Sequence, residues 1–337
     1  MKKLVVITNE KIYENDNSFY CNNLDIKSTC MGLERYFDIF LVGRSSKNIC
    51  SHKINLKDVR IFKNTLSIFN FFSFLRKDSY KFLIISLTPF TLFLSLLLKT
   101  MGKKSYLYLR SDGFGEYKSI FGFIGPIIYY FLFSIGTRIS SVISCRDYIL
   151  RGKKGTVITP SQLTSLWLSA NSNNNSQITK LLYVGRLKKE KGIFNLIKMM
   201  KNKSKFVSLT IVGKEKNDTK NIYEEGISIL DIETDEKRLI KIYDEHNIFV
   251  LPSYTEGQPM VIHEALARKR PIIIFNEIKH VVQGRKGIFV SDRNSKSFFE
   301  KVEYINNNYD SIQNEMKSNK LPLKDDFLSD ISKIINI

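Results

Sequence analysis

The chain has 337 residues, of which 43% are hydrophobic and 12% aromatic, enough to bury the cores of two ordinary domains and too apolar for a disordered protein. Its net charge is +19, and residues 1–176 hold +13 of it, with 24 Lys and Arg against 11 Asp and Glu. Such a basic half attracts the phosphates of nucleic acid, anionic lipid or a lipid-linked pyrophosphate, although a lysine-rich composition that serves solubility gives the same count.

Short apolar runs alternate with helical segments in the first half of the chain. This alternation predicts a parallel sheet with helices on both faces. A polar loop is expected over residues 10–17, and residues 45–80 have no clear assignment, with Ile68–Leu75 fitting either a lipid-facing helix or core. The expected strands are Leu4–Thr8, Asp38–Val42, Phe82–Ser86, Ser105–Arg110, Ile139–Ser144 and Thr156–Pro160.

Two uncharged runs, Phe82–Leu98 and Ser119–Thr137, have lengths close to the minimum for a membrane-spanning helix. Pro89 divides the first run into a strand-like and a helix-like part, and glycines and Pro126 interrupt the second. Three interpretations stay open for these runs: a spanning helix, buried core, or contact with one face of a membrane. Leu4–Ile7, after the basic Met1-Lys2-Lys3, is too short for the apolar region of a signal peptide, so no signal peptide is expected.

Asp112 and Glu116 follow the expected strand Ser105–Arg110 in a glycine-rich segment. Either acid could orient the hydroxyl of an acceptor substrate at this strand end. An Asp-Gly turn explains the same residues equally well. Farther along, the polar tract Asn171–Ser176 is typical of a linker, and we place the domain boundary there.

The second half opens with a strand, a loop and a helix over Lys180–Ile193. Arg186 leaves the end of the strand, directly after Gly185, and Lys191 stands at the entrance of the helix. Backbone amides at a helix start, together with two cations, form an anion site. Further strands are expected at Leu209–Gly213, Ile227–Leu230, Pro271–Phe275 and Gly287–Val290.

The most informative stretch is Ile248–Ala267, which predicts a buried strand, a loop with Gly and Pro, and a helix from near Met260. Glu256 lies on the loop at the carboxyl end of the strand, and Glu264 lies in the early turns of the helix. Ligands bind at this edge of open α/β sheets, and a carboxylate can hold the two hydroxyls of a sugar diol. The alternative is that Glu256 is a solvated loop acid and that Glu264 is an acid near a helix start, favoured there by the helix dipole.

The pattern Pro252-Ser253-x-x-Glu256-Gly257-x-Pro259-x-x-x-x-Glu264-Ala265 resembles the signature of retaining nucleotide-sugar glycosyltransferases of the group 1 type. Gly185-Arg186, four residues, Lys191-Gly192 is similar to the diphosphate motif of the same family. The resemblance covers residues 180–290 well and the first half only in its general layout. Departures from the family pattern include Lys214-Glu215 in place of a second glycine, and they leave the identity of the donor sugar open.

The resemblance implies the GT-B fold, an α/β arrangement of two Rossmann-like domains that face a central cleft. Residues 1–172 would form the acceptor-side domain, residues 177–322 the donor-binding domain, and residues 324–337 a C-terminal helix that packs back on the first domain. Arg186 and Lys191 would grip the donor diphosphate, and Glu256 would contact the donor sugar. Glu264 would hold the nucleotide ribose. The donor would also be lined by Gly185, Gly257, Gln258, Pro259 and Met260.

The expected function is a hexosyl transfer with retention, from a nucleotide diphosphate sugar to a lipid-linked glycan in cell-surface polysaccharide synthesis, lipopolysaccharide included. Arg186, Lys191, Glu256 and Asp112 are the expected catalytic residues, with no metal and no cofactor besides the donor substrate. The expected location is cytoplasmic, peripheral on the inner membrane face through the basic first half, with no nucleic-acid partner. A GT-B epimerase or phosphorylase, and a basic non-enzymatic protein that binds phosphate or nucleic acid, are the alternatives.

Overall fold

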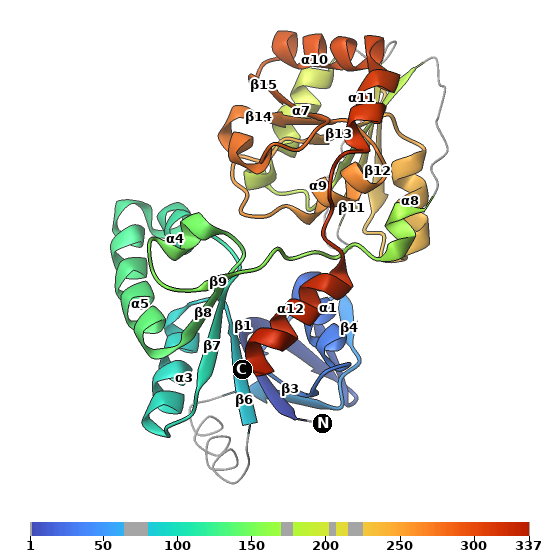
Figure 1. Ribbon diagram of the computed structural model, residues 1–337. Coiled ribbons are helices and arrows are strands. Elements are labelled where there is room, and N and C mark those ends of the chain that lie inside the picture. Colours follow the sequence, from blue (N-terminus) through green and yellow to red (C-terminus); the bar gives the residue numbers. More distant parts are fainter. Residues whose placement is uncertain (1, 64–79, 170–177, 202–206, 215–224, 337) are drawn as a thin grey trace. The chain divides into compact units, whose positions relative to one another are not determined.

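The computed structural model describes residues 2–63, 80–169, 178–201, 207–214 and 225–336, and it divides into two compact units (Figure 1). Unit 1 comprises Met1–Gln162 and Lys324–Ile337, and unit 2 comprises Leu163–Leu323. The division lies before the polar tract Asn171–Ser176 that the sequence suggested as the boundary, because Leu163 and Trp167 are already buried in the core of unit 2. The tract itself lies outside the described residues.

Unit 1 is built on one sheet in which β4-β2-β1-β6-β7-β8-β9 are neighbours in that order, while β3 pairs with β1 and with β5. The ladders along β1-β6-β7-β8-β9 and the ladders of β3 with β1 and β5 are parallel, as the alternation of strands and helices predicted. The strands are β1 Lys3–Asn15, β2 Ser18–Cys21, β3 Asp38–Ser45, β4 His52–Ile54, β5 Asp58–Phe62, β6 Tyr80–Ile85, β7 Ser105–Leu109, β8 Ser141–Ser144 and β9 Thr156–Val157.

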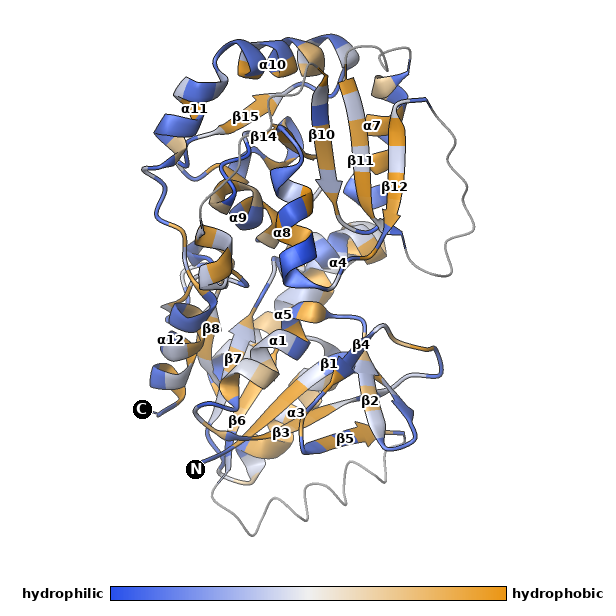
Figure 2. Cartoon of the chain, turned by 90° about the vertical axis from the view of Figure 1, so that its right-hand side faces the viewer, coloured by the Kyte–Doolittle hydropathy of each residue, from blue (hydrophilic) through white to orange (hydrophobic). Residues whose placement is uncertain are grey.

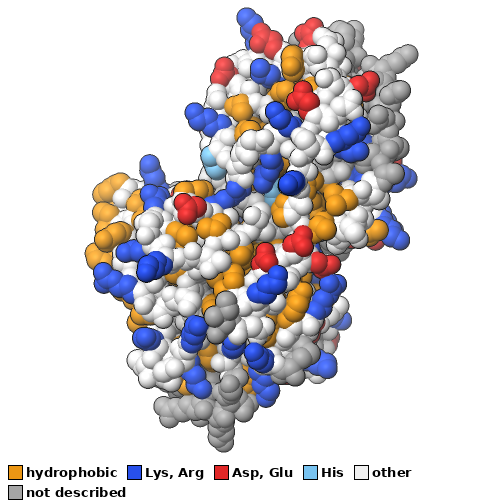
Figure 3. All heavy atoms as spheres, viewed as in Figure 1, with side chains coloured by type: hydrophobic (Ala, Val, Ile, Leu, Met, Phe, Trp, Pro, Cys, Tyr) orange, Lys and Arg blue, Asp and Glu red, His pale blue; other side chains and the backbone are white. Residues whose placement is uncertain are grey.

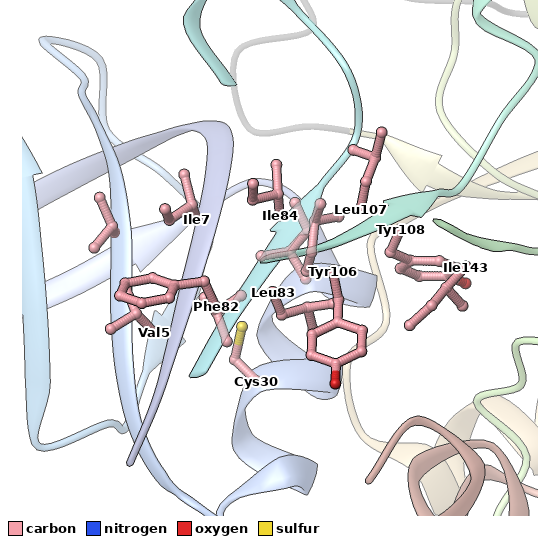
Figure 4. Close-up of a cluster of buried hydrophobic side chains, with 14 of the residues drawn as sticks. Val5, Ile7, Cys30, Phe82, Leu83, Ile84, Tyr106, Leu107, Tyr108 and Ile143 are labelled. Carbon is pink, nitrogen blue, oxygen red and sulfur yellow. The ribbon is translucent and has the colours of Figure 1, made fainter. Parts of the chain in front are cut away.

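Apolar strands and helices enclose the core of unit 1. Phe82, Leu83 and Ile84 of β6 lie beside Tyr106 and Leu107 of β7, as Figure 4 shows. The segment Ile68–Leu75 lies outside the described residues. The helices are α1 Leu24–Leu33, α3 Pro89–Thr100, α4 Gly113–Phe121, η1 Gly122–Ile124, α5 Gly125–Ile139, α6 Asp147–Leu150 and α12 Lys324–Asn336.

The polar loop expected over residues 10–17 is wrong, because β1 continues to Asn15 and forms an antiparallel hairpin with β2. Asp16 and Asn17 make the turn, both with positive φ, at 44° and 58°. Two consecutive residues of positive φ form the hairpin turn whose twist matches that of the strands, and Asp and Asn tolerate this conformation. The turn chemistry was therefore present in the sequence and indicated a hairpin.

The C-terminal helix α12 belongs to unit 1, although the chain reaches it from unit 2. Leu328 of α12 packs against Gly32 of α1, where an added Cβ would lie 2.4 Å from the leucine side chain. Arg35, just past the end of α1, forms an ion pair of 2.7 Å with Asp325 of α12, and the ring of Phe327 lies 6.2 Å from that of Tyr108.

Unit 2 holds a wholly parallel sheet in the order β12-β11-β10-β13-β14-β15. Figure 2 shows β11 and β12 coloured mainly as hydrophobic, whereas α10 and α11 carry long hydrophilic stretches. All four strands that the sequence predicted in this half beyond the two motif strands are present. The strands are β10 Thr179–Val184, β11 Val207–Lys214, β12 Ile227–Asp231, β13 Ile248–Leu251, β14 Ile272–Phe275 and β15 Ile288–Ser291.

Helices follow most of these strands, as in a Rossmann-like domain. Because the strands are parallel, the loops that leave their carboxyl ends meet along a single edge of the sheet. The helices of unit 2 are η2 Ser165–Leu168, η3 Lys189–Lys191, α7 Ile193–Met200, α8 Glu236–Asp244, α9 Met260–Ala267, η4 Asn276–Val281, α10 Ser295–Asn307 and α11 Tyr309–Met316.

Candidate functional site

The candidate site lies at the carboxyl edge of the unit 2 sheet, where β10 and β13 are adjacent strands. Residues 185–192 leave β10 and residues 252–259 leave β13, so strand pairing alone brings the two loops together. The two motifs, which are about seventy residues apart in the sequence, therefore meet at one place in the fold.

A short ion pair joins these loops. Nζ of Lys191 donates to Oε1 of Glu256 at 2.7 Å, and Oγ of Ser253 donates to the same oxygen at 2.6 Å. The side chains of Lys191 and Glu256 are 23% and 10% exposed, so the pair is screened by water less than a surface salt bridge is. Among the described residues, none donates to Oε2 of Glu256, which leaves that oxygen available to a ligand.

Gly192 sets how closely the loops approach. Its φ is +68°, and an added Cβ would lie 1.9 Å from the carbonyl oxygen of Pro252. The backbone N–H of Tyr254 donates to the carbonyl of Glu190 at 3.0 Å, which closes the contact on its other side. Only glycine allows both the positive φ and this close approach of the two backbones.

Arg186 begins the first loop with an exposed side chain, and its backbone carbonyl accepts a hydrogen bond of 2.9 Å from the hydroxyl of Tyr183. Burial and the negative charge of Glu256 raise the pKa of Tyr183, whereas the charge of Arg186 lowers it. Both charges thus act on one buried hydroxyl. Gly185 is also closely packed, because its carbonyl oxygen would lie 2.1 Å from a Cβ added at Gly213 on the neighbouring strand.

Glu264 lies on α9, and its carboxylate is held by Tyr243 of α8. The tyrosine hydroxyl donates to Oε2 of Glu264 at 2.9 Å, and its ring is stacked on Phe249 of β13 with the centroids 5.6 Å apart. Burial, followed by the charge of Glu264, raises the pKa of Tyr243 well above its usual value. Tyr243 therefore stays protonated and donates to Glu264, which holds this carboxylate in place.

The segment Gly257–Met260 links the two glutamates and ends at the first residue of α9. The amide Oε1 of Gln258 is buried with no hydrogen-bond partner among the described residues, and its Nε2 lies 3.4 Å from Nε2 of His263. Neither α7 nor α9 begins with a side-chain cap, since Gly192 and Pro259 occupy these positions. Uncapped helix starts present backbone N–H groups and a positive dipole end to an anion.

Sequence reasoning missed three residues that fix the Glu256 loop. Arg293, which follows β15, donates to the carbonyls of Pro252 and Ser253 at 2.8 and 3.1 Å and lies over the ring of Tyr254. Glu277 pairs with Arg293 at 2.6 Å, and this hydrogen bond holds the pKa of Glu277 below its usual value.

The third missed residue is His280, whose Nε2 lies 2.8 Å from the carbonyl oxygen of Glu256. A carbonyl only accepts hydrogen bonds, so Nε2 of His280 carries the proton. These residues come from later strands of the sheet, and no local pattern marks them as partners of the Glu256 loop.

Asp112, the candidate for the acceptor side, lies in unit 1 as the N-cap of α4. Its Oδ1 accepts a hydrogen bond of 3.2 Å from the N–H of Phe114, and Arg151 lies 3.9 Å away. The structure therefore assigns Asp112 a capping role whether or not it also contacts a substrate. Within the described residues, no group of three or more His, Cys, Asp and Glu is placed to hold a metal ion.

The donor-side half of the chain matches a known protein family. Residues 178–308 match the model of the family "Glycosyl transferases group 1". The capsular polysaccharide biosynthesis glycosyltransferase CapM of Staphylococcus aureus is 33% identical over 138 residues, which cover 37% of this chain and 36% of CapM. The match thus spans about a third of that relative.

Solved structures that superpose over nearly the whole chain include HepE and WaaG. Anabaena HepE in complex with UDP has a TM-score of 0.68 and 11% identity, covering 98% of this chain and 95% of HepE. WaaG, a glycosyltransferase involved in lipopolysaccharide biosynthesis, has a TM-score of 0.66 and 12% identity, covering 98% and 99%. The chain therefore has the α/β GT-B fold that its motifs predicted.

Proposed function

We propose that this chain, whose residues 178–308 match the group 1 glycosyltransferase family, moves a hexose from a nucleoside diphosphate sugar to a glycan acceptor in cell-surface polysaccharide synthesis. The observation that carries the proposal is the pair between Lys191 and Glu256 at the carboxyl edge of the unit 2 sheet. The relatives support the donor class, since HepE was solved with UDP and CapM acts in capsular polysaccharide synthesis by name.

We infer that the bound nucleotide sugar separates Lys191 from Glu256 and gives each of them a new partner. A diphosphate oxygen takes Lys191 from Glu256, with Arg186 and the uncapped start of α7 as further donors to the diphosphate. Glu256, still held by Ser253, then accepts a hydrogen bond from a sugar hydroxyl. Lys191 and Glu256, which pair with each other when no nucleotide sugar is bound, thereby come to bind its diphosphate and its sugar respectively.

The chemical step follows from this arrangement. The bond between C1 of the sugar and the diphosphate oxygen breaks, and a bond from C1 to the acceptor oxygen forms on the same face. The acceptor proton passes to the departing diphosphate, so no protein nucleophile takes part. Lys191 and Arg186 stabilise the charge that develops on the leaving group, an effect typically worth a few kcal/mol for each preorganised donor. Glu264, held by Tyr243, accepts hydrogen bonds from the ribose.

The acceptor assignment extends the proposal to unit 1. We propose a lipid-linked glycan acceptor whose hydroxyl Asp112 orients, with the enzyme at work on the cytoplasmic side. The excess of +13 in residues 1–176 supports this assignment, because a lipid-linked pyrophosphate is a polyanion.

Ligand-induced stabilisation tests the donor. Nucleoside diphosphate sugars with different bases and sugars should raise the melting temperature, the matching donor most, and the Lys191→Ala variant should lose the shift. Product analysis by NMR should show the anomeric configuration of the donor retained in the glycan. A nucleotide-free sugar phosphate as the product, or an epimerised donor, would instead identify the phosphorylase or the epimerase. Tighter binding of oligonucleotides than of every nucleotide sugar would contradict the proposal.

A further inference from the structure

A helical pair in unit 1 exposes an apolar surface that the glycosyltransferase site does not use. Figure 3 shows hydrophobic side chains gathered at the left edge of the molecule, where α4 and α5 lie in Figure 1, with Lys and Arg side chains close by. We call this surface the α4–α5 face. Its exposed members are Ile120 at 67%, Phe121 at 53%, Phe123 at 83%, Ile124 at 48%, Ile127 at 55%, Ile128 at 36%, Tyr130 at 59%, Phe131 at 62% and Ile135 at 39%.

This segment is divided into α4, η1 and α5, although Gly113–Ile139 is long and apolar enough to cross a membrane by length and composition. The helix breaks at Gly122, whose φ is +63°, and α4 then folds against α5. Cβ atoms added at Gly113 and Gly125 would lie 2.0 Å from Tyr129 and Tyr117, so each glycine lets the paired helices touch. The 15 residues of α5 span about 22 Å, less than the roughly 30 Å of a bilayer core.

Nor is the segment a core helix, because only 22% of its most apolar window is buried. The buried side chains, such as Tyr129 and Phe133, point inward and pack against Phe114 with ring centroids 4.9 and 5.6 Å apart. The outward side chains find no comparable cover among the described residues. Soluble proteins rarely leave so many adjacent large apolar side chains exposed unless a partner covers them.

A basic pocket of about 400 Å³ adjoins this surface at the carboxyl end of α5, one turn beyond Ile135. Its lining combines four cations, Lys99, Lys103, Lys104 and Arg138, with the hydroxyl side chains of Ser105, Ser140 and Ser141. No acid lines it. Burial lowers the pKa of nearby Lys81, and the charges of Lys2 and Lys104 lower it further, which shows that positive charge accumulates on this side of unit 1.

We propose that unit 1 docks on an anionic bilayer through the α4–α5 face, with a lipid headgroup phosphate in the pocket of Lys99, Lys103, Lys104 and Arg138. Apolar side chains would enter the boundary between headgroups and acyl chains, while the adjacent cations bind the headgroups. A second protein copy is the weaker fit, since the pocket would place four like charges at the edge of that interface. The proposal goes beyond the glycosyl transfer and does not depend on it.

Flotation of the full chain with lipid vesicles tests the docking. The protein should float with vesicles of about 30 mol % phosphatidylglycerol in phosphatidylcholine, and markedly less with phosphatidylcholine alone or in about 0.5 M NaCl. The double variant Phe123→Ser/Phe131→Ser should bind at least about tenfold more weakly. The double variant Lys99→Gln/Arg138→Gln should lose about fivefold for each cation removed, and only on the anionic vesicles.

The loop that carries Lys47 and Ile49 provides matched controls in the same unit. Ile49 is 79% exposed, so Ile49→Ser and Lys47→Gln remove the same kinds of side chain without touching the α4–α5 face. Both should bind vesicles like the parent chain. All variants should keep the parent melting temperature and the parent stabilisation by nucleotide sugar, because their side chains are exposed and far in sequence from the unit 2 site.

Two results would overturn the proposal. One is equal flotation of the parent chain and the Phe123→Ser/Phe131→Ser variant. The other is a concentration-dependent dimer in analytical ultracentrifugation that this variant abolishes, since the surface would then be covered by a second copy. Loss of donor binding with intact flotation would count against the glycosyl transfer alone.

Discussion

The unit 2 sheet carries an ion-pair cluster at each of its two edges, and the clusters differ in the burial of their cations. At the amino edge, Asp244 accepts hydrogen bonds of 2.8 and 2.7 Å from Nε and Nη2 of Arg268, and its Oδ1 lies 3.4 Å from Nη2 of Arg270. Both arginines are 1% exposed. At the carboxyl edge, Lys191 and Glu256 are partly exposed, and Glu256 receives both of its bonds on one oxygen.

This difference separates a structural ion pair from a site that can exchange partners. Arg268 also donates to the carbonyls of Trp167 and Ser169 at 2.9 Å, so its guanidinium joins the η2 segment to α8 and α9. The two guanidinium groups are therefore closed to a ligand, although the carboxylate of Asp244 is 16% exposed. Arg268 and Arg270 follow the end of α9, where the helix dipole favours cations, but their guanidinium groups are buried and pair with Asp244. The following predictions probe the contrast between the two edges.

Removing the acid of the amino edge should cause the largest change in stability. Asp244→Ala leaves Arg268 and Arg270 buried without their carboxylate, which should cost about 3–5 kcal/mol of unfolding free energy. Lys241→Met, which breaks the exposed pair with Glu245 one turn away, should cost less than about 1 kcal/mol. Urea denaturation measures both. Equal effects would remove the distinction between buried and exposed pairs on this helix.

Removing the cation of the carboxyl edge should affect turnover instead. Lys191→Ala should lower the rate of sugar transfer by about 10²–10³-fold while leaving the unfolding free energy within about 1 kcal/mol of the parent value. Lys189→Ala is the matched control, since Lys189 is an exposed cation on the same loop. Initial rates with the matching donor measure the effect. If Lys191→Ala retained normal rates, the diphosphate assignment would fail.

The close approach of the two site loops predicts an effect on stability and on donor binding together. Gly192→Ala combines a positive φ with a clash at the Pro252 carbonyl and should cost about 3 kcal/mol. Gly284→Ala has almost the same φ, +71°, but meets no atom within 4 Å, so it should cost only about 1 kcal/mol. Thermal unfolding with and without donor compares them. Similar losses for both would mean that the loops separate easily.

Asp112 extends the comparison to unit 1. Asp112→Ala should cost about 1 kcal/mol through loss of the α4 cap, whereas Asp112→Asn keeps the cap and should cost almost nothing. If Asp112 also orients the acceptor, Asp112→Asn should slow transfer without changing the donor-induced thermal shift. Normal transfer by this variant would leave Asp112 with the capping role alone.

The smallest expected effect concerns pH and the amino edge. His246 lies between the carbonyl of Ile242 and the hydroxyl of Thr210, and burial lowers its pKa from 6.5. As the pH falls, His246 therefore takes up a proton in the unfolded chain at a higher pH than in the folded chain. The unfolding free energy is at its full value above pH 6.5 and decreases as the pH falls below it. His246→Gln should flatten the unfolding free energy between about pH 5 and 7. Burial also lowers the pKa of His52, so part of the slope should remain.

Local patterns predicted most of the fold and the centre of the site. Apolar runs of four to six residues marked the parallel strands, and the Glu256 and Lys191 motifs marked the loops at their carboxyl ends. The hairpin of β1 and β2 was missed because the acids and lysine within Glu10–Asn15 outweighed its turn signal. The strands β4 and β5 were missed because β4 has only three residues and because Asp58 and Arg60 interrupt the apolar residues of β5.

The sequence by itself determined that both loops lie at the carboxyl edge, since parallel strands end at the same edge of a sheet, and the pairing of β10 with β13 places the loops side by side. Only the tertiary structure decided how they are held. Arg293, which follows β15, reaches the Glu256 loop, and Tyr243 of α8 reaches Glu264. These partners are too far apart in the sequence for the repeat of a helix or a strand to predict their contact. It also decided that α4 and α5 turn most of their apolar surface outward. Burial depends on what packs against a segment, and composition alone does not specify that partner.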